Sequence, residues 1–318
     1  MTLQQQIRAN RFRSTIVILG FVVLLLLLAG LIGLALDTSL AIVALAVAAI
    51  YGVFGVVNSR RLIAGITQAQ AVGPDELRPL RRLVENVSIG AGLPVTPELR
   101  VVEDEAPNAF AAGLRPTSSY IGVTTGLLRA MPKRELEAVL AHEVSHIRNR
   151  DTYLMTMATV FAGVIALVGD IGFRSIAYGG RRRGGGALVA ILAIVGLVLA
   201  PYAALLLRMS LSRRREFLAD AGAAEILSDA EAMALALRRL ELDPTTVRYS
   251  NSSTAHLWVE SPTERVDSLK TGVIEFSSFF NTHPPTRARI AALEEAGGFR
   301  LPDRLALDAP FAVELGLA

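Results

Sequence analysis

The chain of 318 residues contains no cysteine, and only 19% of its residues are charged. The absence of cysteine excludes disulfide frameworks, cysteine-ligated zinc, iron–sulfur clusters and a cysteine nucleophile. Soluble domains carry about 25% charged residues, so this chain is short of the side chains that form a water-facing surface. Together with a mean hydropathy of +0.45, this shortage indicates an integral membrane protein.

The net charge of +3 and the isoelectric point near 9.5 raise the question of a nucleic-acid partner. The excess positive charge lies in arginines that flank apolar runs, which is where membrane proteins keep it. Aromatic residues make up only 6% of the chain, and no basic stripe with interleaved aromatic residues occurs. We therefore predict no nucleic-acid partner.

Two long apolar runs near the start of the chain, residues 15–36 and 40–57, are joined by Asp37, Thr38 and Ser39. Since about 20 helical residues cross the hydrocarbon core of a bilayer, these runs predict a transmembrane hairpin. A cleaved signal peptide is the alternative for the first run. Its apolar stretch is longer than the roughly 7–15 residues usual in such peptides, so we expect a retained anchor.

A second hydrophobic pair, residues 154–171 and 187–207, is joined by a basic, glycine-rich link. If both runs cross the membrane, Arg174 and the arginines at 181–183 lie on the non-cytoplasmic side, against the positive-inside rule. The alternative is that these runs are only partly embedded. In either case both ends of the pair return to the same side of the membrane.

Arginine positions predict the orientation of the first hairpin. Three arginines precede the first run and two follow the second, namely Arg8, Arg11, Arg13, Arg60 and Arg61. By the positive-inside rule both flanks face the cytoplasm. We therefore expect a multi-pass protein of the cell membrane whose polar parts face the cytoplasm.

The apolar runs divide the chain into four parts: a tail and hairpin at 1–57, a polar segment at 58–152, the second hydrophobic pair at 153–207 and a polar segment at 208–318. In the first polar segment the patterns predict a helix over 75–91 and short strands between residues 99 and 123. A further helix is predicted from Pro132 to about Asp151. We expect the two polar segments to fold together as one catalytic domain.

The last of these helices carries the peptide HEVSH. Residues i and i+4 share one helix face, so His142 and His146 can bind one metal ion. Glu143 lies beside that face and can reach a water molecule at the metal without being a ligand. Two neutral nitrogen ligands and a carboxylate base are what a zinc hydrolase needs. An exposed helix with two surface histidines is the alternative.

A catalytic zinc site also needs a third protein ligand, and no third histidine follows the HEVSH peptide closely. The candidate is Glu216, in the peptide SRRREFLAD. Glu216 and Asp220 share a helix face, which suits a ligand and a carboxylate that orients a ligand histidine. Taken alone, the spacing fits a solvated acidic face beside Arg213, Arg214 and Arg215 better.

The peptides HEVSH, SRRREFLAD and THPPTRARI occur in this order, with hydrophobic segments between the first two. In these features the chain resembles the HtpX-type membrane zinc metalloproteases, relatives of the CAAX prenyl endoproteases, over nearly its whole length. The resemblance implies a mostly α membrane protein with an α+β zincin-like catalytic domain of the gluzincin kind, carrying a small β-sheet. It also implies that Glu216 and Asp220 form the ExxxD motif that supplies the third zinc ligand.

The resemblance further implies where a substrate binds. Asn108, Ala109 and Phe110 would lie on an edge strand beside the cleft, where an extended substrate adds by backbone hydrogen bonds. His283 and Arg289 would stabilise the oxyanion of the tetrahedral intermediate, as cationic donors facing developing charge do. The alternative for the HPP peptide is a turn that starts the last helix, with Arg289 on its surface.

We therefore predict a membrane-bound zinc endopeptidase with one zinc ion per chain, acting on polypeptides and in contact with the lipid bilayer. The resemblance implies quality control, with cleavage of misfolded or damaged membrane proteins under stress. A zinc-binding membrane scaffold without proteolytic activity is the alternative. A small transporter is disfavoured, because such a protein carries ionisable residues inside its spans and only Asp170 approaches such a position.

Overall fold

The computed structural model describes residues 38–73, 75–157, 159–160, 213–248, 257–259, 284–303, 305 and 308–317, with five isolated residues nearer the N-terminus. The chain divides into two compact units. One comprises residues 1–59 and 157–210, and the other comprises residues 60–156 and 211–318. Most of the predicted runs at 15–36 and 154–171, and all of the run at 187–207, lie outside the described residues.

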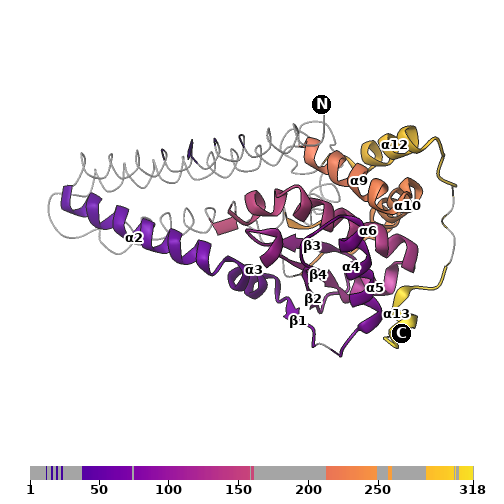
Figure 1. Cartoon of the computed structure of the whole chain (residues 1–318), viewed down its shortest axis with the longest axis horizontal. Helices are drawn as coiled ribbons and strands as arrows, with labels where there is room; N and C mark the ends of the chain where they lie inside the picture. The colour runs from indigo at the N-terminus through magenta and orange to yellow at the C-terminus, as the bar shows by residue number, and fades with distance from the viewer. Residues whose placement is uncertain are drawn as a thin grey trace. The chain divides into compact units, whose positions relative to one another are not determined.

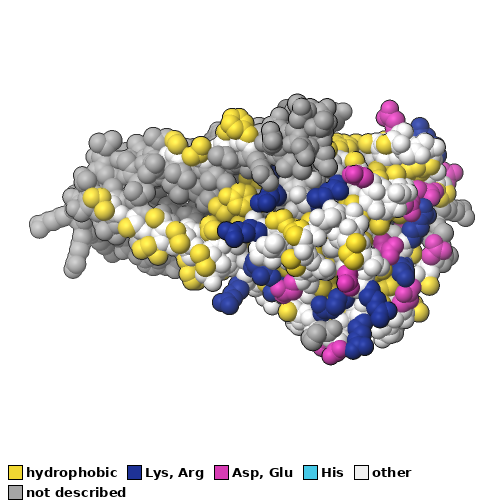
Figure 2. Space-filling model, in the orientation of Figure 1, with side chains coloured by type: hydrophobic (Ala, Val, Ile, Leu, Met, Phe, Trp, Pro, Cys, Tyr) yellow, Lys and Arg dark blue, Asp and Glu magenta, His cyan; other side chains and the backbone are white. Residues whose placement is uncertain are grey.

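In the first unit, α2 (Thr38–Val57) is one uninterrupted helix over the predicted run 40–57. Several of its apolar side chains are more than half exposed, among them Ile42, Ile50, Val53 and Phe54. On the side of α2 that Figure 2 shows, the described side chains are hydrophobic, with no charged side chain between them. Within the described part of the chain, no helix combines the length and the apolar character that a membrane crossing requires.

The second unit contains a four-stranded sheet with the strand order β1-β2-β4-β3. Its strands are β1 (Gln70–Ala71), β2 (Glu98–Val102), β3 (Ala109–Ala112) and β4 (Tyr120–Thr124). β2 and β4 are parallel, whereas β1 and β3 run antiparallel to their neighbours. The strands predicted between residues 99 and 123 are confirmed, and β3 forms one edge of the sheet.

The two faces of the sheet differ in what they contact. Leu99, Ile121 and Val123 project into the main hydrophobic core, which they share with side chains of the helices. On the opposite face the Phe110 ring covers its partner on β4, Gly122. A Cβ atom at position 122 would lie 2.3 Å from that ring, so glycine leaves the space that the ring occupies.

The central helix of the second unit is α6 (Lys133–Arg148), which carries the HEVSH peptide. It packs against β3 and α4 (Arg78–Gly90), and also against α9 (Arg213–Leu227) and α10 (Ala230–Leu242), as Figure 1 shows. His142 is 0% and His146 is 4% exposed. The alternative of an exposed helix with two surface histidines is therefore wrong, because helices and sheet enclose this helix.

The predicted helix boundaries need two corrections. The helix predicted to begin at residue 75 begins at Arg78, because Leu77 takes a left-handed conformation with φ 48°. The helix predicted to reach Asp151 ends at Arg148, because Arg150 is left-handed with φ 61°. Other described elements are α3 (Ser59–Thr67), η1 (Pro116–Ser118), α5 (Thr125–Ala130), α12 (Thr286–Gly297) and α13 (Phe311–Glu314), and residues 151–157 are also helical.

Candidate metal centre

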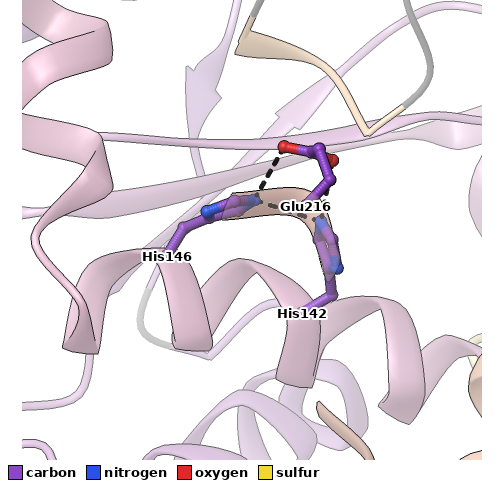
Figure 3. Close-up of side chains that lie close together, drawn as sticks. All are labelled: His142, His146 and Glu216. Atoms are coloured by element: carbon purple, nitrogen blue, oxygen red, sulfur yellow. Dashed lines mark hydrogen bonds and ion pairs between the residues drawn. The ribbon is translucent and has the colours of Figure 1, made fainter. Parts of the chain in front are cut away.

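Three side chains from two helices meet at the candidate centre. His142 and His146 lie one turn apart on α6, with their Nε2 atoms 3.1 Å from each other. Glu216, in the first turn of α9, places Oε2 3.7 Å from Nε2 of His142 and Oε1 3.5 Å from Nε2 of His146. One ligand atom from each residue lies within 4.8 Å of the others, and Figure 3 shows all three side chains converging.

The separations of these atoms fit a zinc ion. Ligand atoms bound at about 2.0–2.1 Å in a tetrahedral zinc site lie about 3.3 Å apart, close to the distances of 3.1, 3.5 and 3.7 Å found here. Two imidazole nitrogens and one carboxylate also form the donor set of zinc sites that keep a position open. The residues present therefore suit this metal.

The charges around the histidines also favour a cation. Among the described buried side chains nearby, four carboxylates stand against two guanidinium groups: Glu143, Asp151, Glu216 and Asp220 against Arg215 and Arg289. With neutral histidines, the negative charges exceed the positive ones by two, which is the charge of one divalent cation. Burial of a net charge is costly unless a counter-ion is present, so a divalent cation would balance this cluster when both histidines are neutral.

His142 is oriented by a carboxylate on the same helix as Glu216. Its Nδ1 atom lies 3.0 Å from Oδ1 of Asp220. Asp220 in turn accepts two hydrogen bonds from Arg289 of α12, at 2.6 and 2.8 Å. A carboxylate on the outer nitrogen fixes the tautomer that leaves Nε2 free for a metal. The structure thus brings Asp220 to the position that the ExxxD spacing suggested.

His146 is oriented by Asp151, which the sequence analysis missed. Oδ2 of Asp151 lies 3.1 Å from Nδ1 of His146, and Oδ1 lies 3.4 Å from Nη1 of Arg215. Helical spacing cannot bring residues 146 and 151 together on one face, because five residues along a helix turn well past it. The left-handed Arg150 ends the helix first and turns Asp151 back. No sequence pattern predicts a positive φ at an arginine, so the contact between Asp151 and His146 could not be predicted.

The two histidines differ in their affinity for a proton. Burial lowers the pKa of His142, and the charges of His146 and Arg289 lower it further. Burial also opposes a charge on His146, but the hydrogen bond to Asp151 and the charge of Glu216 outweigh it and raise the pKa of His146 to about 9. For Asp220, burial favours the neutral form, yet Arg289 holds the pKa below its usual value.

Glu143 follows His142 on α6 and is 1% exposed. Its negative charge is one of the causes that raise the pKa of His146, after the hydrogen bond to Asp151 and the charges of Glu216 and Asp151. A buried carboxylate beside, but outside, the ligand set is where a general base is needed. Its catalytic role stays a prediction.

The predicted substrate-binding residues are not open to solvent. Asn108, Ala109 and Phe110 are at most 4% exposed. The N–H of Val259 donates to the carbonyl of Ala109 at 3.0 Å, and Trp258 pairs with Phe110, their ring centroids 4.7 Å apart. The outer edge of β3 is therefore occupied by the chain itself, and a substrate could pair there only after residues 257–259 leave.

The two residues predicted to stabilise an oxyanion are placed differently. His283 lies outside the described residues. Arg289 is buried rather than on the helix surface, and besides Asp220 it lies 3.5 Å from Glu216 and donates to the carbonyl of Val259 at 3.3 Å. These contacts link Arg289 to the ligands and to the segment on the β3 edge. Its oxyanion role stays a prediction.

A buried helical HExxH pair, a carboxylate from a second helix within reach of the same ion and a neighbouring glutamate are typical of metal-dependent peptidases. The model of peptidase family M48 matches residues 74–297. The chain belongs to this family, and this confirms the resemblance that the motifs indicated.

Two relatives extend the similarity over most of the chain. A protease HtpX homolog of Streptococcus gordonii is 33% identical over 302 residues, which cover 92% of this chain and 99% of that protein. A protease HtpX homolog of Dictyoglomus thermophilum is 40% identical over 241 residues, which cover 76% of each chain. The crystal structure of S. mikatae Ste24p superposes with a TM-score of 0.47 and 16% identity, covering 92% of this chain and 67% of that chain.

Proposed function

We propose that this protein is a membrane-anchored zinc endopeptidase whose catalytic unit faces the cytoplasm. The observation that carries the proposal is the convergence of His142, His146 and Glu216, whose ligand atoms lie within 4.8 Å of one another. Membership of a peptidase family supports hydrolysis of peptide bonds rather than of another substrate. The proposed physiological role is quality control, the degradation of misfolded or damaged membrane proteins.

Each residue of the centre has a distinct task in this proposal. His142, His146 and Glu216 hold the zinc ion. When bound, zinc acts as a Lewis acid that polarises the scissile carbonyl and acidifies water. Glu143 accepts a proton from the attacking water and returns it to the leaving amine. Asp220, held by Arg289, keeps His142 in the tautomer that a ligand needs.

The proposed substrate is an extended polypeptide that pairs with β3. Ala109 offers a backbone carbonyl on the outer edge, and Val259 occupies it in this structure. An extended peptide makes the same kind of bond when it adds to a sheet edge. Substrate binding in this scheme therefore includes displacement of residues 257–259 from the edge of β3.

Membrane anchoring is supported by the apolar sequence runs and by the exposed apolar side chains of α2. Because the chain has no cysteine, single-cysteine variants report topology without background. Asn86→Cys, at an exposed position of α4, should be protected in intact cells from a membrane-impermeant maleimide and become labelled after lysis. Ser39→Cys, between the two predicted spans, should be labelled in intact cells. The reverse pattern would contradict the proposed orientation.

Catalysis is tested with Glu143→Gln and a matched control. The purified wild type and the variant are loaded with one equivalent of zinc, and cleavage of an unfolded protein is measured. We expect both to bind zinc, and only the wild type to cleave. Glu137→Gln, a half-buried position on the same helix, should retain activity. Zinc binding without cleavage in the wild type as well would support the non-proteolytic scaffold instead.

The metal ligand is tested in the same way. Glu216→Gln should lower the zinc affinity, because a neutral amide is a far poorer zinc ligand than a carboxylate. Glu225→Gln, on the same helix, carries an exposed carboxylate and should bind zinc as the wild type does. Equal affinities in all three proteins would place the third ligand elsewhere.

A further inference from the structure

Asp151 and Arg215 are two buried, oppositely charged side chains beside the metal centre. Asp151 is 1% and Arg215 is 3% exposed. One carboxylate oxygen of Asp151 lies 3.1 Å from Nδ1 of His146, and the other lies 3.4 Å from Nη1 of Arg215. The Asp151 carboxylate therefore bridges a candidate ligand and an arginine on another helix.

The backbone just before Asp151 is in a strained conformation. Arg150, the residue before it, is left-handed with φ 61°, a conformation that costs a non-glycine residue about 1–2 kcal/mol. Burial of the carboxylate adds a further cost unless it is paired. Strain of this kind persists only where the surrounding structure compensates it. The contacts with His146 and Arg215 are the compensation visible here.

The Asp151–Arg215 pair at His146 has a counterpart at His142. His142 contacts Asp220, which contacts Arg289, just as His146 contacts Asp151, which contacts Arg215. The pairs differ in two respects. Arg289 donates hydrogen bonds of 2.6 and 2.8 Å to Asp220, whereas Arg215 lies 3.4 Å from Asp151. Arg215 also immediately precedes the candidate ligand Glu216 in α9. The Asp151–Arg215 contact therefore joins the end of the HExxH helix to the residue beside the third ligand.

We propose that Asp151 and Arg215 are positioning residues of the metal centre. Asp151 accepts the N–H of Nδ1 of His146, which leaves Nε2 with its lone pair directed at the metal. Arg215 holds Asp151 in place and fixes the start of α9, and thereby Glu216, relative to His146. The inference rests on the proposed zinc function, and it adds a second positioning pair to the one that contains Asp220.

Zinc affinity tests the proposal directly. All variants are made in the Glu143→Gln background, so that self-cleavage does not interfere, and the dissociation constant is measured by competition with a chromophoric chelator. Asp151→Asn should weaken zinc binding about 10–100-fold, as loss of a carboxylate partner of a ligand histidine does. Asp243→Asn, at a half-buried position just past the end of α10, is the control and should bind as the parent does. An unchanged affinity in Asp151→Asn would overturn the proposal.

The absorption spectrum of bound cobalt tests the positioning role separately, because a residue that only stabilises the fold would leave this spectrum unchanged. Cobalt(II) is loaded in place of zinc, and its visible absorption reports the geometry of the ligands. Asp151→Asn should change this spectrum, because an amide can present its NH2 group to Nδ1 and favour the other tautomer. An unchanged spectrum, together with an unchanged metal affinity, would show that His146 keeps its orientation without Asp151.

Arg215 provides the second variant. Arg215→Gln should weaken zinc binding, and Arg215→Lys should recover part of the loss because it keeps the charge. The double variant Asp151→Asn/Arg215→Gln should lose less affinity than the two single losses combined, since both act through one contact. Additive losses would contradict the coupling. If Asp151→Asn does not fold, the two single Arg215 variants decide the proposal, and an unchanged zinc affinity in Arg215→Gln would overturn it.

Failure of the inference and failure of the proposed function give different results. If the parent protein binds no zinc or cobalt, the zinc function itself is wrong and this inference falls with it. If the parent binds one equivalent and the Asp151 and Arg215 variants bind equally well with the same cobalt spectrum, only the positioning role is wrong.

Discussion

Gly222 of α9 lies directly against Ser145 of α6. A Cβ atom built at position 222 would lie 2.1 Å from Oγ and 3.1 Å from Cβ of Ser145. Ser145 is the residue before His146, and Gly222 is two residues beyond Asp220. The distance between the two helices that supply the candidate ligands is therefore set by the absence of one side chain.

Gly222→Ala should weaken zinc binding. Contacts of this closeness cannot be accommodated without movement, so α9 must shift away from α6 and carry Glu216 with it. We expect at least a tenfold loss of zinc affinity, measured by chelator competition, with the helical content unchanged by circular dichroism.

The same contact provides its own control. Ser145→Ala removes Oγ, the closer of the two atoms, and should restore most of the affinity when combined with Gly222→Ala. The single variant Ser145→Ala should bind zinc nearly as the wild type does. No recovery in the double variant would mean that α9 is held by other contacts.

Arg289→Gln distinguishes two roles for this arginine. Its two hydrogen bonds to Asp220 and its proximity to Glu216 imply that the variant loses zinc affinity. A residue that only stabilises an oxyanion would lower kcat and leave the metal affinity unchanged. We expect a lower zinc affinity in Arg289→Gln, determined by chelator competition alongside steady-state kinetics. Full affinity with reduced kcat would support the oxyanion role alone.

The contacts of Asp229, away from the metal centre, predict a contribution to stability that depends on pH. It caps α10 by accepting the N–H of Ala232, and Arg134 of α6 donates two hydrogen bonds to it. The Arg134 contact holds the pKa of Asp229 below its usual value of 3.8. Because the folded state binds the proton more weakly, the stabilisation is present above pH 3.8 and is lost as the pH falls through the lowered pKa.

Two variants separate the cap from the ion pair. Asp229→Ala should lower the free energy of unfolding by about 1–2 kcal/mol at neutral pH, and Asp229→Asn should cost less because asparagine also caps helices. Urea unfolding of the metal-free protein at several pH values measures both. The difference between wild type and Asp229→Asn should shrink on acidification; a difference independent of pH would contradict the ion pair.

The sequence predicted the parts of the centre that follow a helical period. His142, Glu143 and His146 share one helix, and Glu216 and Asp220 share another, so each set could be placed by counting residues. The meeting of the two sets at one point depends on helix packing, and the role of Gly222 in that packing has no local signature. Asp151 was missed because a left-handed arginine, not a helical turn, brings it back to His146.

β3 is one of the short strands predicted between residues 99 and 123, and its place at an edge of the sheet was implied by the family resemblance. The sequence carried no signal that Trp258, more than a hundred residues later, pairs with that strand. Such a contact arises from tertiary folding, and periodicity within either segment does not report it. A substrate role for Asn108, Ala109 and Phe110 consequently depends on whether the pairing can open.

Val259→Pro tests whether the chain competes with substrate for the β3 edge. Proline has no N–H, so the variant loses the hydrogen bond to the carbonyl of Ala109, while the Val259 carbonyl that accepts from Arg289 remains. One such bond is worth about 1 kcal/mol, or about a fivefold change in an equilibrium. Val259→Ala shortens the side chain, keeps the N–H and serves as the control. If residues 257–259 must leave before substrate binds, Val259→Pro should lower KM for an extended peptide severalfold relative to Val259→Ala, at similar kcat. A KM that is unchanged or higher would mean that substrate binds without opening this pairing.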